Sequence, residues 1–288
     1  MREAQPPQGS YVDEIIRYYD STWFDYRTVW LNGRNLAKHW GFWREGIRTH
    51  AESLIQMNRE VAARADPRPG QTVLDAGCGV GGTSLWLAEN YRVNVVGVSL
   101  SAKEVARARA YVARRGLEEQ VSYEQENFLA MSFPDASFDL VWAQESVCHV
   151  PDKARFFAEA SRVLRPGGRL VMEDWFRHRR PYPEPHEQLL KKWLGGWAIP
   201  DLATPEELRT WGKAAGFTEV TLEDISSYVE PSMRRLYRLG IAFYPGALLL
   251  RALRIRSDVE HGNIRSARLH RQAYRRHLWF VGILTARK

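Results

Sequence analysis

"LDAGCGVGG", the stretch from Leu74 to Gly82, places four glycines in nine residues directly after a short apolar run. A glycine-rich turn between a strand and a helix lets the backbone approach a ligand closely and presents free N–H groups where the helix begins. Gly77, Gly79 and Gly82 fit the spacing of the dinucleotide fingerprint, which also expects Asp or Glu at the end of the second strand, about 20 residues further on. That position in "VVGVSLS" holds Ser99. The turn is therefore expected to bind a ligand other than NAD.

Short apolar runs alternate with helical patterns on both sides of this turn. The expected strands are residues 72–75, 93–99, 121–124, 138–143, 169–174, 217–223 and 278–285. The expected helices are residues 82–90, 102–115 and 153–164, and a further one that a capping box at Thr204 begins and Gly216 ends. Alternating strands and helices predict an α/β fold with a parallel sheet that helices cover on both faces.

Four segments are expected along the chain. Residues 1–65 hold more aromatic side chains than a core-facing stripe requires, and they are expected to form an N-terminal helical lid. Residues 66–224 are the sheet core, residues 225–277 form a basic helical cap, and residues 278–288 contain the last core strand. Open α/β sheets bind ligands at the carboxyl ends of their strands, so lid and cap are expected to cover that edge.

Composition limits the class and the compartment. The chain has 288 residues, 44% of them apolar, which is enough for a substantial core. Cys78 and Cys148 do not have the spacing of a metal site or a disulfide framework, which favours a reducing cytoplasm. The N-terminus lacks a hydrophobic signal core, and the longest apolar run, Leu239 to Leu250, is too short to span a membrane. We therefore expect a cytoplasmic protein. The sequence is compatible with a homo-oligomer.

The positive charge is concentrated near the C-terminus. The whole chain carries a net charge of +7, whereas residues 231–288 hold 13 basic and two acidic side chains, a net charge of +11. Such asymmetry indicates an anionic partner, which is a nucleic acid, a membrane surface or a phosphorylated substrate. A solvated, arginine-rich helical surface is the alternative interpretation.

Three motifs together resemble one enzyme family. Asp75-x-Gly77-x-Gly79-x-Gly81 after an apolar strand resembles the cofactor motif of class I S-adenosylmethionine (SAM) dependent methyltransferases. The resemblance continues through "FPDASFDLVWAQESVCHVPDK" and "EASRVLRPGGRLVMEDW", so that it covers roughly residues 70 to 175. It is greatest to the branch that contains sterol C-methyltransferases, tocopherol methyltransferases and cyclopropane fatty acid synthases. The resemblance implies a Rossmann-like sheet, with the basic cap inserted between the last two strands.

The resemblance also implies which residues hold SAM. The methionine part would lie beside Asp75, Gly77, Cys78, Gly79 and Gly81. The ribose would lie beside Ser99, Leu100 and Glu104, the adenine beside Asn127 and Phe128, and the reactive end beside Gln144. Asn127 stands where the family usually has an aspartate, and its amide oxygen accepts a hydrogen bond from the adenine amine equally well.

Candidate bases and aromatic side chains follow from the chemistry of methyl transfer. An oxygen acceptor needs a base to remove its proton, whereas an alkene acceptor forms a carbocation that aromatic faces stabilise and a base later deprotonates. The base candidates are Glu145, His149 and Glu173, of which Glu173 is the first choice because it ends the fifth strand close to Trp175. The expected substrate-binding aromatic residues are Tyr18, Tyr19, Trp23, Trp175 and Trp197.

The basic cap decides between substrate classes. Arg268 and Arg275 are expected on one helix face, where arginine forks suit a phosphate group. The leading hypothesis is therefore C-methylation of a small isoprenoid such as a prenyl diphosphate, as in geranyl diphosphate C-methyltransferases, and Mg²⁺ is a candidate further cofactor if the substrate is a diphosphate. One alternative is O- or N-methylation of a phenolic or amine natural product, with His149 or Glu145 as base. Another is an RNA methyltransferase or nucleic-acid-binding protein, which the apolar run before Leu250 argues against. No protein-bound metal site is expected.

Overall fold

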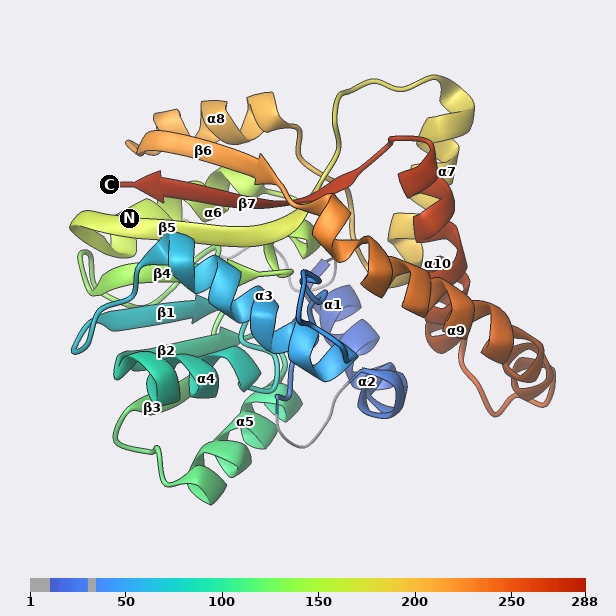
Figure 1. Ribbon diagram of the computed structural model, residues 1–288, viewed down its shortest axis with the longest axis horizontal. Coiled ribbons are helices and arrows are strands. Elements are labelled where there is room, and N and C mark those ends of the chain that lie inside the picture. The colour runs from blue at the N-terminus through green and yellow to red at the C-terminus, as the bar shows by residue number, and fades with distance from the viewer. Residues whose placement is uncertain (1–10, 31–34) are drawn as a thin grey trace.

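A seven-stranded sheet forms the centre of the computed structural model, which describes residues 11–30 and 35–288 (Figure 1). The strand order is β3-β2-β1-β4-β5-β7-β6. The strands are β1 (Thr72–Ala76), β2 (Asn94–Ser99), β3 (Val121–Gln125), β4 (Phe138–Gln144), β5 (Leu164–Phe176), β6 (Thr218–Asp224) and β7 (Phe280–Arg287). The predicted strands are all present, and the Rossmann-like methyltransferase fold is confirmed.

The direction of β7 differs from the expected parallel arrangement. β7 lies between β5 and β6 and runs antiparallel to both, whereas the pairs among β1 to β5 are parallel. The reason is the route of the chain. The basic helical segment lies at the carboxyl ends of the parallel strands, so the chain that leaves it enters the sheet from that end and runs back.

Helices cover both faces of the sheet (Figure 1). One face packs against α3 (His50–Ala65), α4 (Gly82–Tyr91) and α5 (Ala102–Arg115), and the other against α6 (Lys153–Val163) and α8 (Pro205–Ala214). The predicted capping box begins α8, where the Thr204 hydroxyl accepts a hydrogen bond from the backbone N–H of Glu207. Side chains alternate along the strands, so that Trp142 belongs to one apolar core and its neighbour Val141 to the other.

The remaining helices gather beyond the carboxyl ends of the strands (Figure 1). They are α1 (Tyr11–Ser21), α2 (Trp23–Val29), α7 (Glu184–Leu194), α9 (Ser226–Ala252) and α10 (Asp258–Arg275), with short 3-10 turns at η1 (Val147–His149) and η2 (Gly195–Trp197). α10 packs against α9, α7 and α1. The basic segment is thus helical as predicted, and α9 continues through Pro245. No helix in the described part of the chain is long and apolar enough to cross a bilayer.

The segment predicted as a lid has two parts. α1 and α2 lie over the carboxyl edge of the sheet, whereas α3 packs against β5 and β7 and therefore belongs to the core. Residues 1–10 and 31–34 of the predicted lid lie outside the described residues.

Candidate functional site

The glycine-rich turn connects β1 to α4 and contains two kinds of glycine. Gly79 has a φ of +53°, and a Cβ atom there would make only ordinary van der Waals contacts, with the Lys38 Cδ at 3.8 Å and the Glu104 Oε1 at 3.9 Å. Gly81 has a φ of +88°, but its Cβ atom would lie 2.2 Å from the Tyr123 hydroxyl. The backbone at Gly79 therefore borders a cavity, while Gly81 allows close packing against β3.

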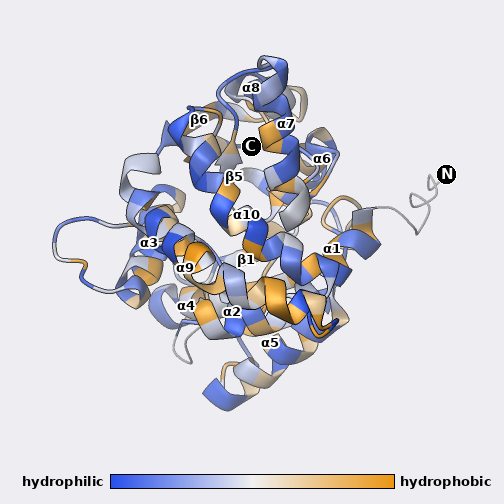
Figure 2. Ribbon diagram, turned by 90° about the vertical axis from the view of Figure 1, so that its right-hand side faces the viewer, coloured by the Kyte–Doolittle hydropathy of each residue, from blue (hydrophilic) through white to orange (hydrophobic). Residues whose placement is uncertain are grey.

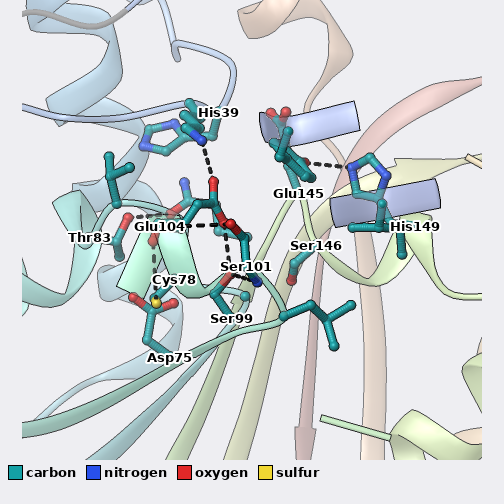
Figure 3. Close-up of a pocket in the computed structure, with 18 of the residues that line it drawn as sticks. His39, Asp75, Cys78, Thr83, Ser99, Ser101, Glu104, Glu145, Ser146 and His149 are labelled. Atoms are coloured by element: carbon teal, nitrogen blue, oxygen red, sulfur yellow. Dashed lines mark hydrogen bonds and ion pairs between the residues drawn. The ribbon is translucent and has the colours of Figure 1, made fainter. Parts of the chain in front are cut away.

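The cavity beside Gly79 lies at the carboxyl ends of β1, β2 and β4, and we call it the cofactor cavity (Figure 3). Its lining includes the predicted cofactor residues Asp75, Gly77, Cys78, Gly79, Ser99, Leu100, Glu104, Phe128 and Gln144. Gly81 and Asn127 are not among the lining residues. The Asn127 amide nitrogen donates to the Tyr11 hydroxyl of α1 (2.9 Å), and the amide oxygen that was predicted to meet adenine accepts from the Leu129 N–H (3.0 Å).

Two carboxyl groups at this cavity suit the polar parts of SAM. Glu104 accepts a hydrogen bond from the Ser99 hydroxyl (2.7 Å) and forms an ion pair with Lys38. Asp75 accepts from the Ser84 hydroxyl (2.5 Å), and burial raises the pKa of Asp75 to about 6. Carboxylate oxygens accept hydrogen bonds from hydroxyl and ammonium groups, and Gly79, which has no side chain, lets a ligand in the cavity approach the backbone. The residues present therefore fit SAM.

A second cavity, which we call the acceptor cavity, lies between α2, α9 and α10 and has a volume of about 340 Å³. Much of its lining is apolar and includes Val29, Trp30, Leu236, Leu239, Phe243 and Leu250. Five residues line both cavities, namely Tyr26, Lys38, Glu145, Trp175 and Trp197. The two cavities thus meet at this group of residues, which we call the junction.

His149 and Tyr19 form a hydrogen-bonded pair on the wall of the cofactor cavity. The His149 Nδ1 lies 3.1 Å from the Ala198 carbonyl oxygen, and its Nε2 lies 2.8 Å from the Tyr19 hydroxyl. Because a carbonyl oxygen only accepts, Nδ1 carries the proton and Nε2 accepts from Tyr19. Burial lowers the pKa of His149 to about 4, so the ring is neutral at physiological pH.

Glu145 reaches the junction, whereas Glu173 does not. Glu145 has a φ of +47°, and its carboxylate accepts a hydrogen bond from the Trp40 N–H. Glu173 is fully buried, lines neither cavity, and neither of its carboxylate oxygens makes a hydrogen bond with the described residues. Burial raises the pKa of both carboxyl groups well above the usual range. The strand register explains the difference, since Glu173 pairs with Gln144 inside the sheet and Glu145 follows the end of β4. Of the three base candidates, Glu145 and His149 therefore line a cavity and Glu173 does not.

The predicted substrate residues divide in the same way. Tyr18 and Tyr19 line the cofactor cavity, and Trp175 and Trp197 line the junction. Trp23 lines neither cavity, and its ring lies 4.1 Å from the Arg107 guanidinium.

Neither predicted phosphate ligand lines a cavity. Arg268 lies over the Tyr244 ring at 4.0 Å, and Arg275 is exposed. The cations that line the acceptor cavity are Lys38 and Arg256, and both are paired with carboxylates, Lys38 with Glu104 and Arg256 with Asp25. In the described residues, no group of three His, Cys, Asp or Glu side chains is close enough to hold a metal ion.

Several cavity residues were not predicted from the sequence. Lys38 and His39 follow α2 in a segment without a recognisable motif, and Thr83 donates to the Gln144 side chain (3.2 Å) from the first turn of α4. Most of the acceptor-cavity side chains of α9 come from the apolar run Leu239 to Leu250, which was considered as a membrane segment and as an argument against nucleic-acid binding, but not as a cavity wall. This apolar run is the one feature of the α9 sequence that indicates a buried or ligand-contacting surface, although it does not show which helix it faces.

This chain is similar to known proteins in both sequence and fold. The model of the methyltransferase domain family matches residues 74–172. A probable tocopherol O-methyltransferase from Oryza sativa is 31% identical over 83% of this chain and 68% of its own. The 27-O-demethylrifamycin SV methyltransferase of Amycolatopsis mediterranei is 33% identical over 76% of this chain and 79% of its own. The crystal structure of the [4+2]-cyclase SpnF superposes with a TM-score of 0.80 at 26% identity, covering 100% of this chain and 99% of the other. The chain belongs to the class I SAM-dependent methyltransferases.

Proposed function

We propose that this methyltransferase transfers the methyl group of SAM to a hydroxyl group of a largely apolar small molecule. The observation that carries the proposal is the hydrogen-bonded pair of Tyr19 and neutral His149 on the cavity wall, next to the junction. An oxygen acceptor needs its proton removed as it attacks, and a neutral imidazole whose Nε2 accepts a hydrogen bond from Tyr19 can receive a proton through that bond.

Tyr19 would relay the proton between acceptor and base. An acceptor hydroxyl that donates to the Tyr19 oxygen passes its proton there, while Tyr19 passes its own proton to the His149 Nε2 over the 2.8 Å hydrogen bond. SAM supplies the electrophilic methyl group, so the acceptor oxygen gains the methyl as the carbon–sulfur bond breaks. The Ala198 carbonyl, which accepts from Nδ1, keeps the imidazole oriented and stabilises the imidazolium formed.

The charges around the acceptor cavity favour a neutral acceptor over a diphosphate. Both cations that line it are already paired with carboxylates, and the predicted phosphate ligands Arg268 and Arg275 lie elsewhere. The similarity to a probable tocopherol O-methyltransferase and to a 27-O-demethylrifamycin SV methyltransferase supports an oxygen acceptor.

C-methylation of an isoprenoid alkene is the second candidate. Three of the five junction residues, Tyr26, Trp175 and Trp197, are aromatic. The faces of their rings would stabilise a carbocation. Glu145 would then remove the final proton, because its carboxylate lines both cavities. A prenyl diphosphate requires in addition that Arg256 or Lys38 exchange its carboxylate partner for the phosphate.

The experiment is an assay with methyl-labelled SAM against phenols, hydroxylated polyketides, prenyl alcohols and prenyl diphosphates, the last with and without Mg²⁺. Labelled ether products from the first two classes, lost in a Tyr19→Phe variant, are the expected result. Labelled carbon-methylated prenyl products that Tyr19→Phe still forms and Glu145→Gln does not would replace the proposal with the second candidate.

A further inference from the structure

The second half of α9 and the turn after it expose an unusual number of large apolar side chains. They are Ile241, Phe243, Leu248, Leu249, Leu250, Leu253 and Ile255, with exposed fractions between 40% and 69%. Phe24 of α2, 69% exposed, lines the acceptor cavity together with Phe243 and Leu250 and so lies beside them. We call these eight residues the apolar tip. Soluble proteins rarely expose contiguous apolar surface on this scale without a binding role.

The apolar tip projects from the rest of the molecule (Figure 1). α9 and α10 extend away from the sheet, and the turn that joins them lies at the far end of the molecule (Figure 1). Figure 2 looks onto that end and shows hydrophobic segments of α9 and α2 facing outward. This projecting helix end holds the exposed apolar side chains. It suits a flat surface into which the side chains can insert.

Basic side chains accompany the apolar tip. Arg238, Arg251 and Arg254 are exposed on the same stretch, and neither Arg238 nor Arg254 has a side-chain partner among the described residues. Residues 231–288 carry a net charge of +11. Two copies of the chain that met through this surface would bring these arginines together, which like-charge repulsion opposes. A surface with anionic phosphate groups above an apolar layer complements both properties.

We propose that the apolar tip docks onto a lipid bilayer with anionic headgroups. The leucine and isoleucine side chains enter the interface, and the arginines contact the lipid phosphates. Phe24, Phe243 and Leu250 are at once exposed and part of the acceptor-cavity wall, so the cavity opens at the docked surface. An apolar acceptor dissolved in the bilayer would reach the junction without crossing water. This inference is independent of which acceptor atom is methylated.

The test is co-sedimentation of the full-length protein with vesicles of phosphatidylcholine, with and without phosphatidylglycerol. A Leu249→Glu/Leu253→Glu variant changes two exposed residues that line neither cavity. Leu249→Phe/Leu253→Phe is its matched control, because it keeps the surface apolar. Arg254→Glu tests the charge, and Arg209→Glu on α8, also exposed, is the matched control far from the tip. SAM affinity by calorimetry verifies that each variant is folded.

The wild-type protein is expected to bind the anionic vesicles and to dissociate at high salt. The double glutamate variant should lose at least about tenfold in affinity and Arg254→Glu about fivefold to tenfold, with both controls unchanged. A wild-type protein that ignores anionic vesicles, or a double glutamate variant that binds them as well as wild type, would overturn the proposal. A wild-type dimer that the double glutamate variant dissociates, without vesicle binding, would show instead that the tip joins two copies.

Discussion

The cofactor cavity and the acceptor cavity are built in different ways. The cofactor cavity takes much of its lining from turns that directly follow β1, β2 and β4, so each lining residue stands at a fixed distance from a strand. The acceptor cavity takes much of its lining from α2, near the start of the chain, and from α9 and α10, near its end. Sheet geometry fixes the first cavity, whereas helix packing shapes the second. Substitutions should therefore separate cofactor binding from acceptor binding.

The largest expected effect is at Gly79. Gly79→Leu would place a side chain in the cofactor cavity and strain a residue whose φ is +53°, so SAM binding should be abolished. Gly70→Leu is the matched control, since Gly70 also has a positive φ (+81°) with open space around it, but lies outside the cavity. Calorimetry with SAM measures both. Normal SAM affinity in Gly79→Leu would contradict the position of the cofactor.

The next effect separates the base candidates. His149→Ala removes the group that receives the acceptor proton, so turnover of a hydroxyl acceptor should fall about a hundredfold while SAM affinity is retained. Glu173→Gln should change turnover little, because Glu173 lines neither cavity. Steady-state kinetics on the same acceptor compare the two variants. A larger loss in Glu173→Gln than in His149→Ala would return the role of base to Glu173.

A smaller effect is expected inside the acceptor cavity. Val29→Trp fills part of that cavity from the end of α2, so the KM for the acceptor should rise about tenfold while the affinity for SAM is unchanged. Acceptor kinetics and SAM calorimetry on one preparation provide both values. Equal weakening of SAM and acceptor would show that the cavities are not separable.

The smallest effect is expected at the cap arginines. Arg275→Glu changes an exposed side chain that lines neither cavity, so the KM for a neutral acceptor should stay within about twofold. Initial rates over a range of acceptor concentrations measure this KM. A large rise in KM for a diphosphate acceptor would instead support the phosphate role predicted from the sequence.

The same contrast explains what could be predicted from the sequence. The sheet, the glycine turn and residues such as Ser99 and Glu104 could be located because a strand end fixes where the next side chains lie. That Glu173 lines neither cavity was not evident from the sequence, because a difference of one residue separates Glu173, still paired with Gln144 in the sheet, from Glu145, which follows the end of β4. The α9 contribution to the acceptor cavity could not be predicted, because an apolar run does not reveal which helix it packs against. Lys38 has no motif, and only the folded chain brings it to Glu104.

The most direct test of the central claim is the pH dependence of single-turnover methyl transfer to a hydroxyl acceptor. His149 has a pKa of about 4 and remains neutral above it, so the rate constant should be nearly constant from about pH 8 down to about pH 5.5. His149→Ala should instead show a rate that rises with pH as the acceptor ionises by itself. A wild-type rate constant that rises about tenfold per pH unit across this range would contradict proton transfer to His149.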